Sequence, residues 1–425
     1  MKRLPATWLV FAVIVVDLTG FGIVIPILPF ISPRLGGNAF DVALVIAIYS
    51  LCAGLVGPFW GGLSDRIGRK RVLMICLLGG ALSYVLLGMA TELWAVYVAR
   101  GFGGLMAGSL PVASALLADL STPDRRAKAM GLVGTAFGLG LILGPLLGGL
   151  LAGEGESFLL AGLFAGGLSL LSVVLAAVLL PDDRLGRLSP AAQAPLEAEI
   201  VTDSTVKPTP MGTDDKPIDS KTGLQHQNLS IPAFIRHYRT EWLVLQYVFH
   251  TLAVSAAIYL SPLWLAALLD WGPREVGILF GLVGLAMIVI QGALLDGLTR
   301  RFGLLNVLSF GAMIFAVSLL AAPMMWGELD RALVILTAFT GATCCLPILN
   351  TIASSVVPDE QRGRMMGVTT MAASLGRVAG PLITGLVLTF GGYSWSWVIL
   401  ALPVLAVWVW SRSGARRYAS INRAG

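Results

Sequence analysis

Long runs of apolar residues, separated by short polar segments, repeat along almost the whole chain. Each run has about 20 residues, which is the length a helix needs to cross about 30 Å of hydrocarbon at 1.5 Å per residue. We therefore predict an all-α membrane protein with twelve transmembrane helices. They lie near residues 8–31, 40–63, 72–91, 93–120, 129–152, 157–180, 242–268, 274–297, 304–324, 330–354, 365–390 and 392–411.

One long polar segment interrupts this pattern in the middle of the chain. Residues 181–230 are rich in Pro, Asp, Thr, Ser and Lys, a composition that buries too little apolar surface to fold alone. We interpret this segment as a flexible cytoplasmic linker, followed at residues 231–239 by a short interfacial helix. The predicted organisation is a six-helix bundle over residues 1–180, a linker over 181–241, and a second six-helix bundle with a short cytoplasmic tail over 242–425.

The distribution of charge supports the membrane interpretation and predicts an orientation. Only 12% of the residues are charged, whereas soluble proteins have about a quarter. With both termini cytoplasmic, 24 of the 29 Lys and Arg residues lie on the inner side, where such residues concentrate in inner-membrane proteins. Arg34, Arg274 and Arg331 lie outside, and Arg100 and Arg377 fall within predicted spans. Because the positive charges sit in short loops rather than on one face, they do not indicate nucleic-acid binding.

An internal repeat relates the two halves of the chain. Several glycines and one proline recur with a constant displacement of 236 residues. These pairs are Gly131 and Gly367, Gly140 and Gly376, Gly144 and Gly380, Pro145 and Pro381, and Gly149 and Gly385. A weaker echo relates the loops after the second and eighth helices, in which Gly61, Leu63 and Asp65 correspond to Gly292, Leu294 and Asp296. Two similar six-helix halves around a midplane site are typical of secondary transporters.

Several motifs resemble those of one transporter family. The run Gly61-Gly-Leu-Ser-Asp-Arg-Ile-Gly-Arg-Lys-Arg71 resembles the loop signature of the major facilitator superfamily. The fifth helix matches the pattern of that family's twelve-helix drug:proton antiporters, with Gly131, Gly140, Gly144, Pro145, Gly148 and Gly149. The first helix, with Asp17-x4-Gly22-x3-Pro26-x2-Pro29, and the fourth, with Arg100-Gly101-x2-Gly104, also resemble these exporters. The stretch from Ala118 to Pro145 is most similar to tetracycline-resistance type multidrug exporters.

This resemblance implies the two-bundle major facilitator fold and export of a small organic compound in exchange for protons, without a cofactor or metal. It also implies that Asp65 acts as a latch holding the halves closed on the cytoplasmic side, and that the glycine stripe of the fifth helix seals the interface between the halves. Independently of the resemblance, Gly140, Gly144 and Gly148 share one helix face at a spacing of four, which lets a neighbouring helix approach closely. The complete set of expected gating and structural motif residues is Gly61, Asp65, Arg66, Gly68, Arg69, Lys70, Gly131, Gly140, Gly144, Pro145, Gly148, Gly149, Asp296, Gly376, Gly380 and Pro381.

Ionisable residues within spans are costly, so each is a candidate for function. Asp17 lies about 13 Å into the first helix, where its carboxyl is the leading proton carrier. Arg100 enters the fourth helix from the other side by about 10 Å, so a long guanidinium side chain can reach the depth of Asp17. A pair between them would hold Asp17 charged until substrate or a proton displaces it. The alternative is a permanent structural salt bridge.

The remaining candidates concern the substrate. Arg377 sits about 18 Å into the eleventh helix, either facing the substrate or bonded to backbone carbonyls or Asn350. Polar and aromatic residues of the spans provide groups that orient a ligand or wall a cavity. The substrate-binding candidates are Phe21, Tyr49, Gln246, Tyr247, His250, Tyr259, Gln291, Asn350 and Arg377.

Two functions remain open at this point. The first is proton-coupled export of a hydrophobic or amphipathic compound. The second is proton-coupled transport of an organic anion, which is favoured by the presence of two intramembrane arginines and only one clear intramembrane acid. A nucleotide-driven enzyme has little support, because the chain has no Gly-x4-Gly-Lys-Ser/Thr loop. We expect the partners to be a small-molecule substrate, protons and the lipid bilayer, and the protein to be a monomer.

Overall fold

The computed structural model describes residues 6–121, 126–153, 158–180, 230–358 and 361–413, so almost all of the predicted linker lies outside the described residues. Residues 1–180 and 242–425 form one compact unit, and residues 181–241 form a second. Every regular element of the described part is a helix. The second unit contains α11 (Ile231–His237), a short helix where the sequence predicts one.

The helices of the first half follow the predicted spans closely. They are α1 (Ala6–Val24), α2 (Leu28–Arg34), α3 (Ala39–Ile67), α4 (Arg69–Gly88), α5 (Leu93–Leu105), α6 (Ser109–Asp119), α7 (Arg126–Ala152) and α8 (Leu159–Leu179). Those of the second half are α12 (Glu241–Leu269), α13 (Pro273–Val289), α14 (Leu295–Phe302), α15 (Leu304–Ala321), α16 (Glu328–Ser355) and α17 (Arg362–Ser413), with a π-helical turn at Ile290–Leu294 and a 3-10 turn at Ala322–Met324.

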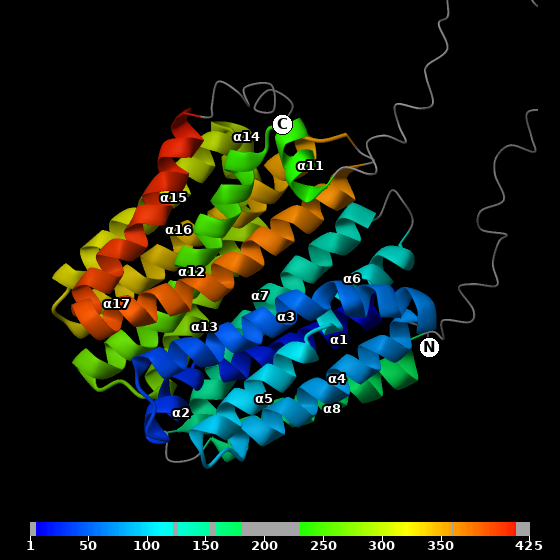
Figure 1. The fold of residues 1–425 in the computed structure, drawn as a ribbon, viewed down its shortest axis with the longest axis horizontal. Coiled ribbons are helices and arrows are strands. Elements are labelled where there is room, and N and C mark those ends of the chain that lie inside the picture. Colours follow the sequence, from blue (N-terminus) through cyan, green and yellow to red (C-terminus); the bar gives the residue numbers. More distant parts are fainter. Residues whose placement is uncertain (1–5, 122–125, 154–157, 181–229, 359–360, 414–425) are drawn as a thin grey trace, which may run out of the picture. The chain divides into compact units, whose positions relative to one another are not determined.

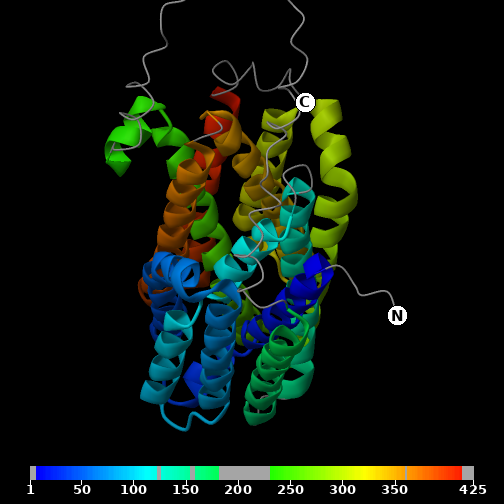
Figure 2. The ribbon, with the colours of Figure 1, turned by 90° about the vertical axis from the view of Figure 1, so that its right-hand side faces the viewer.

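The twelve predicted spans are confirmed, although α17 contains two of them. Eleven helical segments of the described part are long and apolar enough to cross a membrane, and α17 alone has 52 residues. Its two spans meet at Gly392, where φ is 71° and ψ is −175°. Positive φ is readily available only to glycine, so this residue turns the chain back between the last two spans. The protein is therefore a multi-pass membrane protein with two bundles of six spans. Figures 1 and 2 show the helices of the first half gathered beside those of the second.

The first predicted helix, 8–31, is wrong as a single continuous helix. The chain leaves the α-helix after Val24 and resumes it at Leu28. Pro26 explains the break, because a proline has no N–H to donate and disfavours the α conformation of the residue before it. Pro29 then lies in the first turn of α2, where the missing donor costs nothing.

The fourth and eighth predicted helices are also interrupted. Between α5 and α6 the chain breaks over residues 106–108, and the indole N–H of Trp60 donates a 2.7 Å hydrogen bond to the carbonyl of Leu105, which the break leaves without a helical partner. Gly108 fits there because a Cβ would lie only 2.5 Å from the Trp60 ring. The eighth span contains the π-helical turn at Ile290–Leu294, a local widening that often marks a functional segment.

Close glycine contacts hold the first half together. A Cβ on Gly140 would lie 2.6 Å from the side chain of Leu18, and one on Gly22 would lie 2.6 Å from the carbonyl oxygen of Gly140. Gly144 likewise packs against Gly22, and Gly148 against Ile23. The glycine stripe of α7 therefore faces α1 within the same half. The expectation that this stripe seals the interface between the halves is corrected by these contacts.

The second half repeats this packing between α12 and the first part of α17. Gly376 packs against the backbone of α12, where a Cβ would lie 2.5 Å from the carbonyl oxygen of Val248. One turn later, Gly380 packs against Leu252 and Ser255. Gly376 and Gly380 are the repeat partners of Gly140 and Gly144 in α7, so the sequence repeat corresponds to a repeated helix contact.

Two helix pairs make most of the contact between the halves, α7 with α13 and α3 with α17 (Figure 1). In the first pair, a Cβ on Gly149 would lie 2.6 Å from the carbonyl oxygen of Pro273, and one on Gly277 would lie 2.5 Å from that of Pro145. The interface between the halves thus uses Gly149 and the backbone at Pro145. These residues lie on the face of α7 next to the one that carries the glycine stripe.

The α3–α17 pair is antiparallel and in contact along only part of its length. A Cβ on Gly385 would lie 2.8 Å from Ala43, and one on Gly54 would lie 3.4 Å from Ser374. We call one end of the spans the basic end: α3 ends there and α17 begins there. We call the other end the opposite end. The charge count predicts that the basic end is cytoplasmic.

Candidate functional site

Asp17 lies on α1 beside a small cavity between α1, α4 and α6. The hydroxyl of Ser109 donates a 2.7 Å hydrogen bond to its carboxylate oxygen Oδ2. The cavity offers about 10 Å³ for the centre of a water molecule, which is enough for about one water. Its other walls are Val13, Ile14, Leu73, Leu77, Leu110 and Ala113. The hydroxyl of Ser169 is a second polar neighbour of this carboxyl. A carboxyl with hydroxyl neighbours and room for water is suited to binding and releasing a proton.

Arg100 on α5 is buried next to an aromatic pair. Only 3% of the residue is exposed, and its guanidinium carbon lies 4.0 Å from the centre of the Tyr49 ring. The Tyr49 ring lies 5.7 Å from that of Phe21, one turn after Asp17 on α1. Gly104 allows α5 to approach α3 here, because a Cβ on it would lie 2.5 Å from the carbonyl oxygen of Tyr49.

The structure does not bring Arg100 and Asp17 into an ion pair. Within the described residues, the Nε and Nη1 atoms of Arg100 have no hydrogen-bond partner, and the hydrogen bond recorded for Asp17 comes from Ser109. The hypothesis that a pair between these two residues holds Asp17 charged is therefore not met in this conformation. A permanent structural salt bridge between them is excluded for the same reason.

Arg377 on α17 faces the same region from the second half. Its Nη2 donates a 2.9 Å hydrogen bond to the hydroxyl of Ser374, one turn earlier on the helix. Ser374 is the residue against which Gly54 of α3 packs. Arg377 lies close enough to the Tyr49 hydroxyl to interact with it electrostatically. The predicted alternative of bonds to backbone carbonyls or Asn350 is not met in this conformation, in which Arg377 binds Ser374 and Asn350 accepts from Tyr247.

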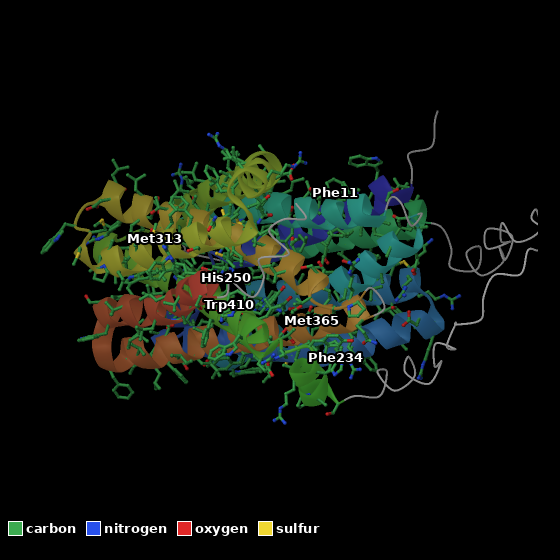
Figure 3. The ribbon with its side chains drawn as sticks, turned by 90° about the horizontal axis from the view of Figure 1, so that it is seen from above. Phe11, Phe234, His250, Met313, Met365 and Trp410 are labelled. Atoms are coloured by element: carbon green, nitrogen blue, oxygen red, sulfur yellow. The ribbon has the colours of Figure 1, made fainter. Side chains whose placement is uncertain are left out.

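Four other candidates lie on α12 and α16 in the second half. The hydroxyl of Tyr247 on α12 donates a 2.8 Å hydrogen bond to Asn350 on α16. Gln246 is 1% exposed, and its Oε1 has no partner among the described residues. His250 is 4% exposed, lies inside the second-half helices (Figure 3) and packs its ring 6.4 Å from that of Phe315. These contacts fit packing within the bundle.

The hydrogen bonds of Tyr259 and Gln291 go to neither Arg100 nor Tyr49. The fully buried Tyr259 donates a 2.6 Å hydrogen bond from its hydroxyl to the carbonyl of Ala39, at the opposite end of α3. It therefore joins the halves, and its role as a wall of the substrate cavity stays a prediction. Gln291 is exposed in the π-helical turn and donates a 3.4 Å hydrogen bond to the carbonyl of Thr343.

The loop between α3 and α4 is organised around Arg69. Its guanidinium binds Asp65 at 2.6 Å and Asp119 at 3.0 Å, and also donates a 2.6 Å hydrogen bond to Ser64. These contacts lie within the first half, so the predicted latch of Asp65 across the halves does not appear among the described contacts of this conformation. Gly68, with φ of 108°, makes the turn between the two helices, and only glycine adopts this conformation without strain.

Other residues of the motifs have local contacts. Lys70 donates a 2.8 Å hydrogen bond from Nζ to the carbonyl of Leu180, joining α4 to the end of α8. In the equivalent loop of the second half, Asp296 pairs with Arg300 at 2.7 Å, and Gly303, with φ of 82°, makes the turn. Pro381 is buried in α17. Arg66 is exposed, and Gly131 lies in the second turn of α7.

The facing stripes of α3 and α17 separate toward the basic end. Gly57 and Gly61 share a helix face with Gly54, and Gly367 shares one with Ser374. No described atom lies within 4 Å of the Cβ position of Gly57, Gly61 or Gly367. In the π-helical turn that follows α13, Gly292 is similarly open. The halves are therefore packed toward the opposite end and apart along these stripes at the basic end.

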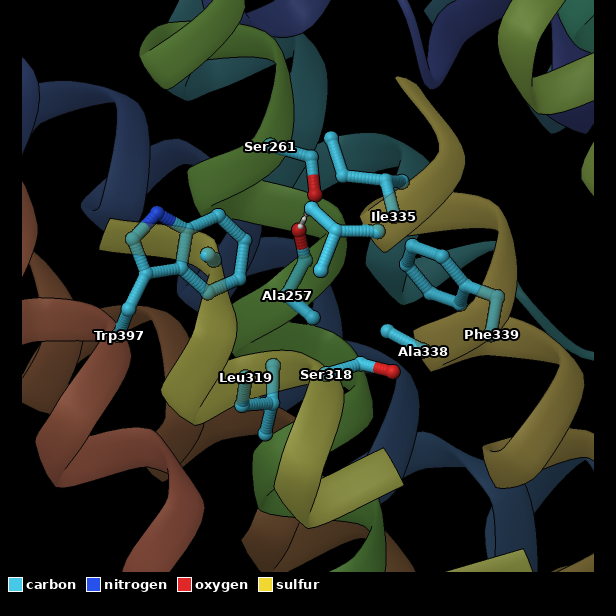
Figure 4. Close-up of a pocket in the computed structure, with 10 residues that line it drawn as sticks. Ala257, Ser261, Ser318, Leu319, Ile335, Ala338, Phe339 and Trp397 are labelled. Carbon is cyan, nitrogen blue, oxygen red and sulfur yellow. Dashed lines mark hydrogen bonds between the residues drawn. The ribbon is translucent and has the colours of Figure 1, made fainter. Parts of the chain in front are cut away.

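A second cavity of similar size lies wholly within the second half (Figure 4). Its walls come from α12, α15, α16 and α17 and include Ser261, whose hydroxyl bonds the carbonyl of Ala257 at 2.6 Å. None of the predicted site residues lines it. Its mostly apolar walls indicate a packing defect rather than a ligand site.

Sequence reasoning missed Ser109, Ser374 and Trp60. Ser109 follows Gly108 directly, and this glycine in the middle of a predicted span was the available signal for a break that turns the next side chain toward Asp17. Ser374 lies one turn before Arg377, where a hydroxyl at a spacing of three predicts a contact on the same helix face. Trp60 carried no signal distinguishing it from other aromatic residues of spans.

Comparison with known proteins identifies the family. The model of the major facilitator superfamily matches residues 10–303 and 243–423. The chain belongs to the major facilitator superfamily. The resemblance of its loop and fifth-helix motifs is thereby confirmed, and so is the fold expected from it. As a member of this transporter superfamily, the protein acts on a small-molecule substrate in the membrane.

Relatives within the superfamily are similar over most of the chain. The tetracycline resistance protein, class C, of Escherichia coli is 26% identical over 97% of this chain and 99% of its own length. The quinolone resistance protein NorA of Staphylococcus aureus (strain MSSA476) is 25% identical over 86% of this chain and 85% of its own.

Solved structures share the fold. The crystal structure of the human organic anion transporter MFSD10 (TETRAN) has a TM-score of 0.65 and 22% identity, and the match covers 97% of this chain and 100% of that one. The crystal structure of a mutant of the nucleoside transporter NupG has a TM-score of 0.72 at 13% identity, and the match covers 96% of this chain and 99% of that one. At these identities the likeness concerns the fold alone.

Proposed function

We propose that this superfamily member is a proton-coupled antiporter that exports small hydrophobic or amphipathic organic compounds by alternating access. The similarity to tetracycline and quinolone resistance proteins over most of the chain supports export of such compounds. The separation of the α3 and α17 stripes at one end, with packing at the other, supports alternating access, because transport requires each end to open in turn.

The observation that carries proton coupling is the environment of Asp17. Its carboxyl lies within a span, accepts a hydrogen bond from Ser109, and borders space for about one water molecule. Carboxyls in such positions act in proton relays of transporters. Binding of substrate nearby, at Phe21 and Tyr49, then competes with the proton through the local charge.

The test is proton movement in proteoliposomes that contain a pH-sensitive dye. Lipophilic cations, neutral drugs and organic anions are added in turn to wild type, to Asp17→Asn and to the control Asp270→Asn. Asp270 is exposed with φ of 53°, a conformation that asparagine also tolerates, so the control removes a carboxylate outside the spans. Substrate-driven proton flux that persists in the control and disappears in Asp17→Asn supports the proposal. Equal flux in all three proteins contradicts it.

The orientation follows from the charge count, and we propose that both termini are cytoplasmic. The basic end is then the cytoplasmic end, and this conformation faces the cytoplasm. In this scheme the Asp65–Arg69–Asp119 cluster forms contacts across the halves when the cytoplasmic end closes. Labelling of a single cysteine at Ile67 by a membrane-impermeant thiol reagent, in inside-out but not right-side-out vesicles, tests the orientation. We further propose that the transporter works as a monomer, to be tested by light scattering in detergent.

A further inference from the structure

Arg100 is a buried cation that lacks hydrogen-bond acceptors for part of its guanidinium. The residue is 97% buried, and neither Nε nor Nη1 has a hydrogen-bond partner among the described residues. The Tyr49 ring at 4.0 Å covers one face of the guanidinium but accepts none of its in-plane N–H groups. A buried charge with unmet hydrogen bonds is costly, which points to a group of opposite charge that joins it during the transport cycle.

A second guanidinium approaches the same aromatic ring from the other half. The contacts of Ala43 with Gly385 and of Gly54 with Ser374 fix the antiparallel register of α3 and α17. Tyr49 lies about midway between the two α3 residues, so it is level with the turn of α17 that begins at Arg377. Arg377 uses only Nη2 in its recorded hydrogen bond, to Ser374, and interacts electrostatically with Tyr49.

The charges around Tyr49 are unbalanced. Arg100 and Arg377 carry two positive charges, and Asp17 supplies one carboxyl, which is neutral whenever it carries the proton. Guanidinium groups bind carboxylates through paired, parallel N–H donors, and this geometry suits an acidic group held between the two side chains.

We propose that the exported compound carries an acidic group that binds between Arg100 and Arg377, with its apolar part against Phe21 and Tyr49. The proposal rests on the transport function proposed above and names the substrate chemistry of the same site. Because one arginine comes from each half, the acidic group links the halves when bound. A negative charge on the bound compound raises the affinity of Asp17 for its proton, whereas a positive charge lowers it. Exchange of the compound for a proton at Asp17 therefore favours compounds that carry a basic group as well as the acidic one.

The test compares four fluorescent compounds that share the dansyl group. Dansylglycine is an anion, its amide is neutral, dansylcadaverine is a cation and Nε-dansyllysine is a zwitterion. Their binding to the purified protein is titrated in detergent free of anionic lipid, so that no lipid headgroup competes. Wild type is expected to bind dansylglycine about tenfold or more tightly than the amide, the gain typical of a charge-assisted bond.

Substitutions of Arg377 carry the test, because this residue is more exposed than Arg100 and tolerates change better. Arg377→Gln should abolish the preference for the carboxylate, and Arg377→Glu should reverse it in favour of dansylcadaverine. Arg412→Gln is the matched control, since it removes the same charge from the far end of the same helix, and should keep the preference. Arg100→Lys keeps the positive charge but loses the paired N–H donors of the guanidinium, so it should weaken the preference for the carboxylate. Gel filtration confirms that each variant is folded.

Either of two results overturns the proposal: wild type binding the carboxylate no better than the amide, or a preference that survives both Arg377→Gln and Arg100→Lys. If dansylcadaverine still drives Asp17-dependent proton flux in that case, the antiporter function stands and the acidic-group proposal alone fails. If instead the carboxylate preference is present and no bound compound moves protons, the proposed coupling fails and the binding site stands.

Discussion

The hydroxyl of Tyr259 donates a 2.6 Å hydrogen bond to the backbone carbonyl of Ala39, and this contact crosses from the second half of the transporter to the first. Tyr259 is fully buried and belongs to α12, whereas Ala39 begins α3. The bond lies at the opposite end from the separated glycines of α3 and α17. It stabilises the closed arrangement of that end, and therefore the conformation open at the basic end.

Removing this hydroxyl is expected to shift the conformational equilibrium. Tyr259→Phe keeps the ring and deletes one hydrogen bond worth about 1 kcal/mol, so the ratio of the two conformations should change about fivefold toward opening of the opposite end. Spin labels on cysteines at the exposed Glu92 and Phe390, one in each half at that end, report the change as a longer distance population.

The matched control for this substitution is Tyr393→Phe. The hydroxyl of Tyr393 donates a 3.0 Å hydrogen bond to Leu263, and both residues belong to the second half. Its loss leaves the distance distribution unchanged if the effect of Tyr259 depends on bridging the halves. Identical distributions for wild type and Tyr259→Phe would show that the bond does not govern closure.

The open stripes at the basic end predict a substitution that folds but does not transport. The register of α3 and α17 places Gly61 level with Gly367, yet neither has a described neighbour within 4 Å. Gly61→Trp should therefore fold in this conformation and clash when the basic end closes. Overpacking costs about 1–3 kcal/mol, which lowers the closed population about five- to 150-fold and slows transport accordingly.

Gly62→Trp serves as the comparison, because this residue is equally open but points about 100° away from the stripe. It should retain near-normal transport at a similar yield of folded protein. Equal transport by Gly61→Trp and wild type in proteoliposomes would mean that the two stripes do not meet during the cycle.

The spans were predictable from sequence because crossing hydrocarbon requires a helix of defined length and composition, and both properties are local. The glycine repeat was visible for a related reason, since Gly140 and Gly376 are needed wherever two backbones approach closely. Pro26 and Gly108 show the limit of this approach, because each lies within an apolar run and changes the helix without changing its hydropathy.

The arrangement of the site was less predictable because it depends on the rotation and neighbours of each helix. Periodicity placed Gly140, Gly144 and Gly148 on one face of α7, but it did not indicate that this face meets α1. Depth alone suggested that Arg100 reaches Asp17, whereas the structure places its guanidinium against Tyr49. Distances along the membrane normal constrain such pairs in one dimension, and the other two are set by tertiary packing.

The ion pairs of the two basic loops are expected to contribute little to stability. Asp119 and Asp296 pair with Arg69 and Arg300, and the side chains of these two acids are 54% and 74% exposed. Exposed pairs contribute about 0–1 kcal/mol. Asp119→Asn and Asp296→Asn should thus change the thermal midpoint by no more than about 2 °C, since about 1 kcal/mol moves the midpoint of a large domain by only a few degrees.

Transport measurements on the same two variants distinguish an effect on folding stability from an effect on the equilibrium between conformations. Because their stability is expected to be unchanged, any slower transport reflects a changed equilibrium between conformations, which the spin-label distances report. A drop of many degrees in the midpoint of Asp119→Asn would instead show that the Arg69 cluster is a structural support of the first half.

The contact between Gly144 and Gly22 predicts where a single methyl group prevents folding. A Cβ on Gly144 would overlap the Cα of Gly22 and lie 2.8 Å from the carbonyl oxygen of Thr19, so the whole of α1 must move to admit it. Alanine gains about 1 kcal/mol of helix propensity over glycine, but a clash with backbone cannot be relieved by rotating a side chain. Gly144→Ala should therefore lower the thermal midpoint by several degrees or abolish the monodisperse peak in gel filtration, and Gly380→Ala should do the same against α12.

Gly167→Ala on α8 isolates the propensity effect, because no described atom lies within 4 Å of its Cβ position. This variant should be at least as stable as wild type, so the difference between it and Gly144→Ala measures the cost of separating α1 from α7. If both variants melt at the wild-type temperature, α1 can move away from α7 at no cost. The glycines of the repeat would then serve the motion of these helices rather than their packing.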